Sequence, residues 1–179
     1  MNIVLIEPKN RDNIATVLRS GKNFGAKTVF IIGGAIRDKY GGNIHKFEHQ
    51  MDTQDGTSSL ALIYFESLSE FLNHLPAKTH IVAIEQGIDS TSLENFEHPK
   101  NATYIFGREA KGILKDEIDS IKNCIHTLQE DIPIEHLSHS TKTVHFSMVE
   151  IKIKESLNLG VCASIVMYDR HSKEKNSII

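Results

Sequence analysis

The chain alternates short apolar runs with stretches in which apolar residues recur at helical spacing. Short continuous apolar runs are typical of strands that are buried on both faces of a sheet. Such runs predict strands at residues 3–6, 28–32, 60–65, 80–85, 103–106 and 144–146. Helical patterns lie between several of these runs, and the alternation predicts an α/β fold with a mostly parallel sheet flanked by helices.

The first helix is predicted after the first strand, where Asp12 or Asn13 can cap it and Gly25 can end it. The residues of its apolar stripe are Ile14, Val17, Leu18 and Phe24. Two further helices are predicted, one at residues 68–75 and one after the fifth strand that ends near Ile121.

The last helix is predicted to begin with Ser156 as its N-cap, because a serine hydroxyl accepts hydrogen bonds from first-turn amides. The residues of its predicted buried face are Leu157, Val161, Ser164, Ile165 and Tyr168. The small residues Gly160 and Ala163 allow another backbone to approach closely. A buried helix that opens with two polar side chains, Ser156 and Asn158, suits a site where a polar ligand meets the core.

The composition predicts one globular domain over residues 1–179, with 40% hydrophobic and 24% charged residues. Residues 129–143 are polar and are interpreted as a surface insertion. No apolar run approaches the about 18 residues of a membrane span, and the N-terminus has no features of a signal peptide. Cys124 and Cys162 are too few for a disulfide framework, so reduced thiols and a cytoplasmic location are expected.

Basic residues are concentrated in the first part of the chain. Residues 1–50 contain eight Lys/Arg and four Asp/Glu, whereas the remainder contains 12 and 19, and the formal net charge is −3. A basic first third could face phosphates. A chance asymmetry on a solvated surface explains the same count equally well.

Three short motifs carry candidate chemistry. The first has Asn10 and Asn13 three residues apart and Arg19 six further on, before Phe24-Gly25-Ala26. The second, Phe106-Gly107-Arg108-Glu109-Ala110-Lys111-Gly112, follows a strand, where a glycine lets a ligand approach the backbone and Glu109 can bond free amides at a helix start. The third, Ser156-Leu157-Asn158, precedes the small apolar helix ending in Tyr168-Asp169. Taken alone, Arg19 reads as a surface residue and the second motif as an ordinary strand-to-helix turn.

In this order and over about residues 2–169, the motifs resemble those of the SpoU/TrmH family, the SPOUT-class RNA ribose 2'-O-methyltransferases. The resemblance is to short members without an added RNA-binding domain. It implies a C-terminal trefoil knot that binds S-adenosylmethionine, a homodimer, no metal, and methyl transfer to a ribose 2'-hydroxyl of RNA, with tRNA favoured over rRNA.

The resemblance also implies roles for individual residues. The implied catalytic residues are Arg19, Asn13, Glu109, Ser156 and Asn158. Because a guanidinium stays protonated, Arg19 is interpreted as a phosphate clamp and alkoxide stabiliser rather than as a base. In the family's homodimer it is expected to face the partner's cofactor. The implied cofactor-binding residues are Ile84, Gly107, Phe146, Met148, Ser156 and Leu157. The candidate RNA contacts are Arg11, Lys22, Arg37, Lys39 and Lys46.

Some residues depart from the family pattern, and two other functions stay open. Arg11 replaces a common proline, Gly160 stands where a serine is frequent, and the segment 129–143 is longer than usual. The family's Ile-Pro-Met is matched to Phe146-Ser147-Met148 in preference to Ile132-Pro133-Ile134, which would leave a long gap to Ser156. One alternative is a non-catalytic RNA-binding relative with the same fold. The other, a nucleotide-dependent oxidoreductase, lacks its dinucleotide-binding fingerprint. The pairs with metal-like spacing, His45/His49 and His136/His139, lack completing ligands and are read as surface histidines.

Overall fold

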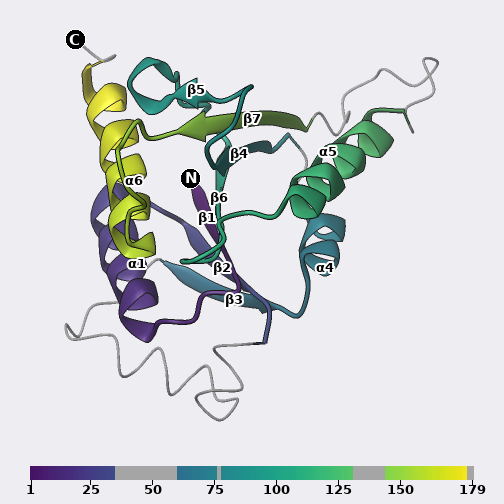
Figure 1. Ribbon diagram of the computed structural model, residues 1–179, viewed down its shortest axis with the longest axis horizontal. Coiled ribbons are helices and arrows are strands. Elements are labelled where there is room, and N and C mark those ends of the chain that lie inside the picture. The colour runs from purple at the N-terminus through teal and green to yellow at the C-terminus, as the bar shows by residue number, and fades with distance from the viewer. Residues whose placement is uncertain (35–59, 76–77, 131–143, 177–179) are drawn as a thin grey trace.

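The computed structural model describes residues 1–34, 60–75, 78–130 and 144–176. These residues form a seven-stranded, all-parallel sheet in the order β3-β2-β1-β6-β4-β7-β5 (Figure 1). The strands are β1 (Asn2–Ile6), β2 (Thr28–Ile32), β3 (Ala61–Phe65), β4 (His80–Ile84), β5 (Thr91–Ser92), β6 (Ala102–Phe106) and β7 (His145–Glu150). The predicted mostly parallel α/β fold is therefore confirmed.

Helices cover both faces of the sheet (Figure 1). They are α1 (Arg11–Phe24), α4 (Leu68–Asn73), the 3₁₀ turn η1 (Leu93–Asn95), α5 (Lys115–Glu130) and α6 (Leu159–Asn176). One core cluster joins α1 and α6 to one face, and a second joins α4 and α5 to the other. The central strands β1, β4 and β6 are almost fully buried, because they are covered on both sides.

Several boundaries differ from the sequence predictions. The short strand β5 and the turn η1 lie in a stretch predicted to be a polar loop, α5 continues past Ile121 to Glu130, and β7 continues past Phe146 to Glu150. The extra residues are polar or alternate in burial, so a continuous apolar run could not mark them. The predicted insertion at residues 129–143 lies outside the described residues, except that residues 129 and 130 end α5.

The N-cap of α1 is Asn10, not Asp12 or Asn13. The Asn10 side chain accepts a hydrogen bond from the Asp12 amide at 2.8 Å, and Gly25 ends the helix in the left-handed conformation as predicted. Asn13 therefore lies inside the first turn, where its side chain is buried and available for contacts beyond its own helix.

The start and the buried face of α6 also differ from the prediction. Asn158, rather than Ser156, caps the helix by accepting hydrogen bonds from the amides of Gly160 and Val161. The residues of α6 that are buried are Leu159, Gly160, Ala163, Val166, Met167 and Arg170. Val161, Ile165 and Tyr168, which were predicted to be buried, are exposed. Apolar residues occur on several sides of this helix, so their spacing does not select one face.

Candidate active site

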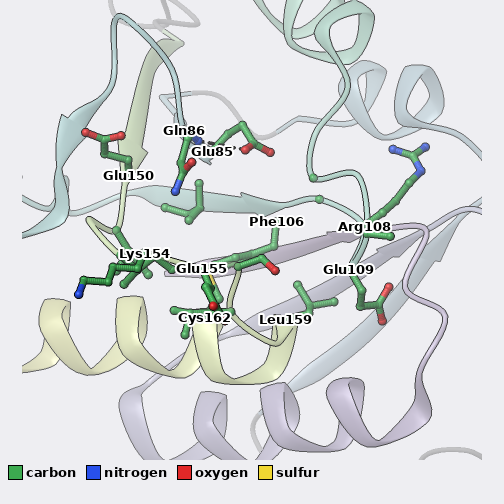
Figure 2. A pocket seen from close by; sticks show the side chains of 18 residues that line it. Glu85, Gln86, Phe106, Arg108, Glu109, Glu150, Lys154, Glu155, Leu159 and Cys162 are labelled. Atoms are coloured by element: carbon green, nitrogen blue, oxygen red, sulfur yellow. Dashed lines mark hydrogen bonds between the residues drawn. The ribbon is translucent and has the colours of Figure 1, made fainter.

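A pocket of about 370 Å³ lies at the carboxyl ends of the neighbouring strands β4, β6 and β7 (Figure 2). This edge of a parallel sheet is where open α/β folds bind ligands, and the volume is within the range of small-molecule sites. Its walls are residues 84–86, residues 106–110 and 112 of the turn after β6, residues 150, 151 and 153–157, and Leu159 and Cys162 of α6. The structure thus brings the second and third sequence motifs to one cavity.

A chain of hydrogen bonds connects all three motifs beside this pocket. The Asn158 amide donates to Asn13 Oδ1 at 2.7 Å, and the Asn13 amide donates to Glu109 Oε1 at 3.0 Å. Glu109 also accepts the backbone amides of Lys9 and Asn10. A carboxylate can only accept, so Asn13 must direct its NH₂ group to Glu109 and its oxygen to Asn158. The direction of both bonds in the chain is therefore fixed.

Glu109 is held as a carboxylate by these donors. Burial alone would raise its pKa, but hydrogen bonds from its own backbone, from the Asn13 side chain and from the Lys9 and Asn10 amides outweigh burial and lower the pKa. The sequence predicted that Glu109 bonds amides at the start of the helix that follows it. That prediction was wrong in location, because α5 begins at Lys115 and the bonded amides precede α1.

Gly107 is required by the shape of the turn that forms the pocket wall. A β-carbon at this position would overlap the backbone of Gly112 and Ile113. The turn is closed by paired hydrogen bonds between Arg108 and Gly112, in which each amide donates to the other carbonyl at 3.0 and 2.9 Å. The sequence predicted that a ligand approaches Gly107 closely. In the structure, the backbone of Gly112 and Ile113 makes this close approach.

Arg108 lines the pocket, but its charge is directed elsewhere. Its guanidinium donates two hydrogen bonds of 2.8 Å to Glu117, and this pairing is the main reason that its pKa is raised. Figure 2 shows the guanidinium turned away from the other labelled side chains. The pair also fixes the start of α5, because Glu117 accepts the Leu114 amide.

Four of the six residues expected to bind cofactor line this pocket, and two do not. Ile84, Gly107, Ser156 and Leu157 are among the lining residues. Phe146 and Met148 are not; they pack on the core cluster under α4 and α5. The pocket lies at the end of β7, and its wall there is formed by Glu150, Ile151 and Ile153 rather than by residues 146–148.

Arg19, Arg11 and Lys22 are not among the residues that line the pocket. Arg19 is exposed on α1 and does not line the pocket of its own chain. Arg11 and Lys22 lie on the same helix. Arg37, Lys39 and Lys46 lie outside the described residues, as do His45, His49, His136 and His139.

Sequence reasoning missed several polar residues of the pocket. Those with ionisable side chains are Glu85, Glu150, Lys154, Glu155 and Cys162. The signal for Glu85 was present, because it directly follows a buried strand that ends at the ligand-binding edge of the sheet. Burial, and secondarily the charge of Glu85, raises the pKa of the Cys162 thiol to about 11, so this cysteine is not a thiolate nucleophile.

Solved structures share this fold. AviRb from Streptomyces viridochromogenes, a SpoU methyltransferase solved in complex with the cofactor AdoMet, matches 98% of the chain with a TM-score of 0.65 and 15% identity, and the chain spans 58% of its length. A structure described as giving insights into the 2-OH methylation of C/U34 on tRNA matches 98% of this chain and 96% of its own, with a TM-score of 0.66 and 18% identity. The TrmH/SpoU tRNA modifying enzyme of A. aeolicus gives a TM-score of 0.63, 16% identity, and coverages of 98% and 75%.

The protein has the fold of these methyltransferases, a parallel sheet with a pocket at its carboxyl edge. The match covers almost the whole chain. The model of the SpoU rRNA Methylase family matches residues 1–129. The chain therefore belongs to the SpoU rRNA methylase family. No curated protein matches it in sequence. No helix among residues 1–34, 60–75, 78–130 and 144–176 is both long and apolar enough to cross a membrane.

Proposed function

We propose that this protein transfers a methyl group from S-adenosylmethionine to a ribose 2'-hydroxyl of RNA, with tRNA as the preferred substrate. The observation that carries the proposal is the hydrogen-bonded chain Asn158–Asn13–Glu109 beside the pocket. It joins residues almost 150 positions apart, and each comes from a different family-like motif. Family membership and the tRNA-methylation structure with nearly equal length support the substrate class.

The pocket has the chemistry that an adenosyl cofactor needs. Apolar surface for a base is supplied by Phe106, Ile151, Leu157 and Leu159. Ile84, Gly107, Ser156 and Leu157 are the residues proposed to hold it, together with Ile151. When bound, S-adenosylmethionine supplies a methyl group on a sulfonium, which is reactive enough to need no metal.

The protein's own residues would bind the ribose and stabilise charge on its oxygen. Arg19 remains protonated and can hold an RNA phosphate while it stabilises the developing alkoxide. Asn13, Glu109 and Asn158 keep α1, the 106–112 turn and the start of α6 in one arrangement. Ser156, which is exposed at the pocket wall, would position RNA or cofactor. The 2'-hydroxyl proton leaves to water or to an RNA phosphate.

A homodimer would explain why Arg19 lies outside its own pocket. Val161, Ile165 and Tyr168 form an exposed apolar strip on α6, 45%, 37% and 59% exposed, and α6 packs beside α1, which carries Arg19. Covering this strip with a second copy would bring α1 of one protomer near the pocket of the other. Sedimentation should give a dimer, and a monomer that methylates RNA would contradict this part of the proposal.

We also propose the trefoil knot that family resemblance implies. It is supported by the sheet order, in which β7 inserts between β4 and β5 although it follows both in sequence. Residues 150–157 then pass along the pocket wall to α6. A crystal structure in which this segment crosses no loop of the chain would contradict the knot.

The decisive experiment compares Arg19→Ala with Lys22→Ala, an exposed neighbour on the same helix. Arg19→Ala should reduce methyl transfer to below about one-hundredth, with an S-adenosylmethionine affinity, measured by titration calorimetry, within about twofold of the wild type. Lys22→Ala should lose only RNA affinity, through one phosphate contact. Retained turnover in Arg19→Ala would refute the role of Arg19.

Mass spectrometry of nucleosides tests the reaction itself. Incubation of tRNA or rRNA with the protein and labelled S-adenosylmethionine should give 2'-O-methylated nucleosides, with more label in tRNA. Label in a base would refute ribose specificity. RNA binding without cofactor binding or turnover would favour the alternative of a non-catalytic RNA-binding relative.

A further inference from the structure

Glu85 connects the walls of the pocket at the end of β4. Its Oε2 accepts the backbone amide of Ile113 at 2.7 Å, and its Oε1 accepts the amide of Gln86 at 3.0 Å. Its own amide donates to the Val149 carbonyl of β7 at 3.0 Å. One residue therefore connects the ends of β4 and β7 with the turn that follows β6.

The turn that Glu85 holds is shaped to receive its carboxylate. Gly112 has a positive φ of 61°, and a β-carbon there would overlap Glu85 Oε2. Ile113 is buried, so its amide depends on this carboxylate for a partner, and a bond to an ionised acceptor is stronger than one to a neutral acceptor. Gly107 and Gly112 thus leave room for the turn and for the side chain that secures it.

The charge of Glu85 also acts inside the pocket. After burial, it is the second cause of the raised pKa of Cys162, which lines the pocket from α6. Figure 2 shows Glu85 at the end of β4, with Arg108 and Glu109 on the segment beside it. The carboxylate is therefore both a mechanical link between walls and a charge that a bound cation would meet.

We propose that Glu85 is a positioning residue of the cofactor pocket, which fixes the 107–113 turn against β4 and so sets the shape of the S-adenosylmethionine site. This inference rests on the proposed function. Without the Glu85 carboxylate, the Ile113 amide loses its acceptor and the turn is free to move relative to Gln86. The same turn carries Glu109, so the disturbance reaches the Asn158–Asn13–Glu109 chain.

The test uses the full-length protein and S-adenosylmethionine in titration calorimetry. Glu85→Ala should weaken binding about tenfold, which corresponds to about 1.4 kcal/mol. Glu85→Gln should have an intermediate effect. The amides of Ile113 and Gln86 each donate to one oxygen of Glu85, and a glutamine side chain has only one oxygen to accept them. In kinetics, the KM for S-adenosylmethionine should rise more than the KM for RNA.

Gly112→Ala gives an independent test of the same contact. It should weaken binding to a similar degree by displacing Glu85, and the double variant Glu85→Ala/Gly112→Ala should bind no more weakly than the weaker single variant. Gly25→Ala is the matched control, because Gly25 also has a positive φ, 78°, and has no atom within 4 Å of the added carbon. It should lower the melting temperature without changing cofactor affinity.

Hydrogen exchange separates failure of this inference from failure of the proposed function. Amide exchange of Ile113 and Gln86 should rise in Glu85→Ala, with or without cofactor. Cofactor affinity within twofold of the wild type, additive effects in the double variant, or unchanged exchange would overturn the role of Glu85. A wild-type protein that does not bind S-adenosylmethionine would overturn the proposed function and the cofactor role together, while exchange would still decide whether Glu85 fixes the turn.

Discussion

Two polar networks hold opposite ends of α6, and they differ in composition and in solvent exposure. At the start of the helix, Asn158 bonds to Asn13, which bonds to Glu109, next to the pocket. Near its end, Asp169 and Arg170 bond to His98 and Tyr104, away from the pocket-lining residues. The first network consists of side-chain amides and one carboxylate, whereas the second combines an imidazole, a phenol and a guanidinium with the carboxylates of Asp169 and Glu174.

The centre of the second network is buried, and its guanidinium is paired with several acceptors. Tyr104 is fully buried and Arg170 is 4% exposed. The Arg170 guanidinium donates to the carbonyls of Pro99 and Lys100, to the Tyr104 hydroxyl, and to Glu174. A buried charge is tolerated only with this degree of pairing. The comparison indicates that the far network stabilises the fold, whereas the near network orders a site.

The largest expected effect is the loss of the far network in Arg170→Met. Methionine keeps apolar volume but leaves two carbonyls and the Tyr104 hydroxyl without their donor, which should cost about 3 kcal/mol of unfolding free energy. Denaturant unfolding measures this cost. S-adenosylmethionine affinity of the folded protein should stay within about twofold of the wild type, and a tenfold loss would break the assignment of the far network to stability alone.

Asn13→Asp should show the opposite pattern at the near network. It replaces the amide donor, 3.0 Å from Glu109, with a second carboxylate. Because neighbouring carboxylates disfavour each other's ionised form, the pKa of Glu109 should rise. Methyl transfer should fall at least about tenfold, while the unfolding free energy falls by about 2 kcal/mol.

The control for this variant is Asn23→Asp. Asn23 is an exposed residue of α1 that donates to the Arg19 carbonyl. The same change in charge there should leave turnover within about twofold of the wild type. Equal losses of turnover in both variants would show that added negative charge on α1, rather than the network, governs activity.

The sequence was sufficient for the parts of the molecule that are coded locally. Apolar runs located six of the seven strands, and the family-like motifs picked out Asn13, Glu109 and Asn158. It could not show that Glu109 bonds amides 99 and 100 residues away, because a helix start offers the same donors to any nearby carboxylate. Nor could it show Glu85, whose partner is 28 residues further on.

The buried face of α6 was the main error, and the extent of β7 was underestimated. Val161 and Ile165 are as apolar as Val166 and Met167, so only packing against α1 decides which are covered. The apolar run at residues 144–146 marked only the start of β7. The expected cofactor contacts were therefore placed at Phe146 and Met148, whereas the strand continues to Glu150 and the pocket is lined from Glu150 onward.

Gly160→Ala tests how closely the near end of α6 packs on α1. The added carbon would lie 2.9 Å from Thr16 Cβ and 3.3 Å from the Asn13 carbonyl oxygen. Helix propensity alone predicts a gain of about 1 kcal/mol, whereas overpacking costs about 1 to 3 kcal/mol. We expect a net loss of about 1 kcal/mol in denaturant unfolding. A net gain would show that the helices separate freely and that the near network is less rigid than the far one.

The smallest effect concerns pH and the far network. Burial lowers the pKa of His98 below its ordinary value of 6.5, despite the hydrogen bond to Asp169 that favours the charged form. The unfolded chain then binds a proton more readily than the folded chain, so this contribution to stability is complete above pH 6.5 and is lost as pH falls through 6.5 towards the folded pKa.

The pH test compares unfolding free energies of the wild type and His98→Gln between pH 8 and pH 5. The wild type should lose more stability over this range than the variant. His80, whose pKa burial also lowers, contributes to the slope of both proteins and cancels in their difference. S-adenosylmethionine affinity should show no such difference, because the near network contains no histidine. Parallel stability curves would mean that His98 accepts its proton without disturbing Asp169, Tyr104 or Arg170, and that the far network tolerates an added charge that its burial should exclude.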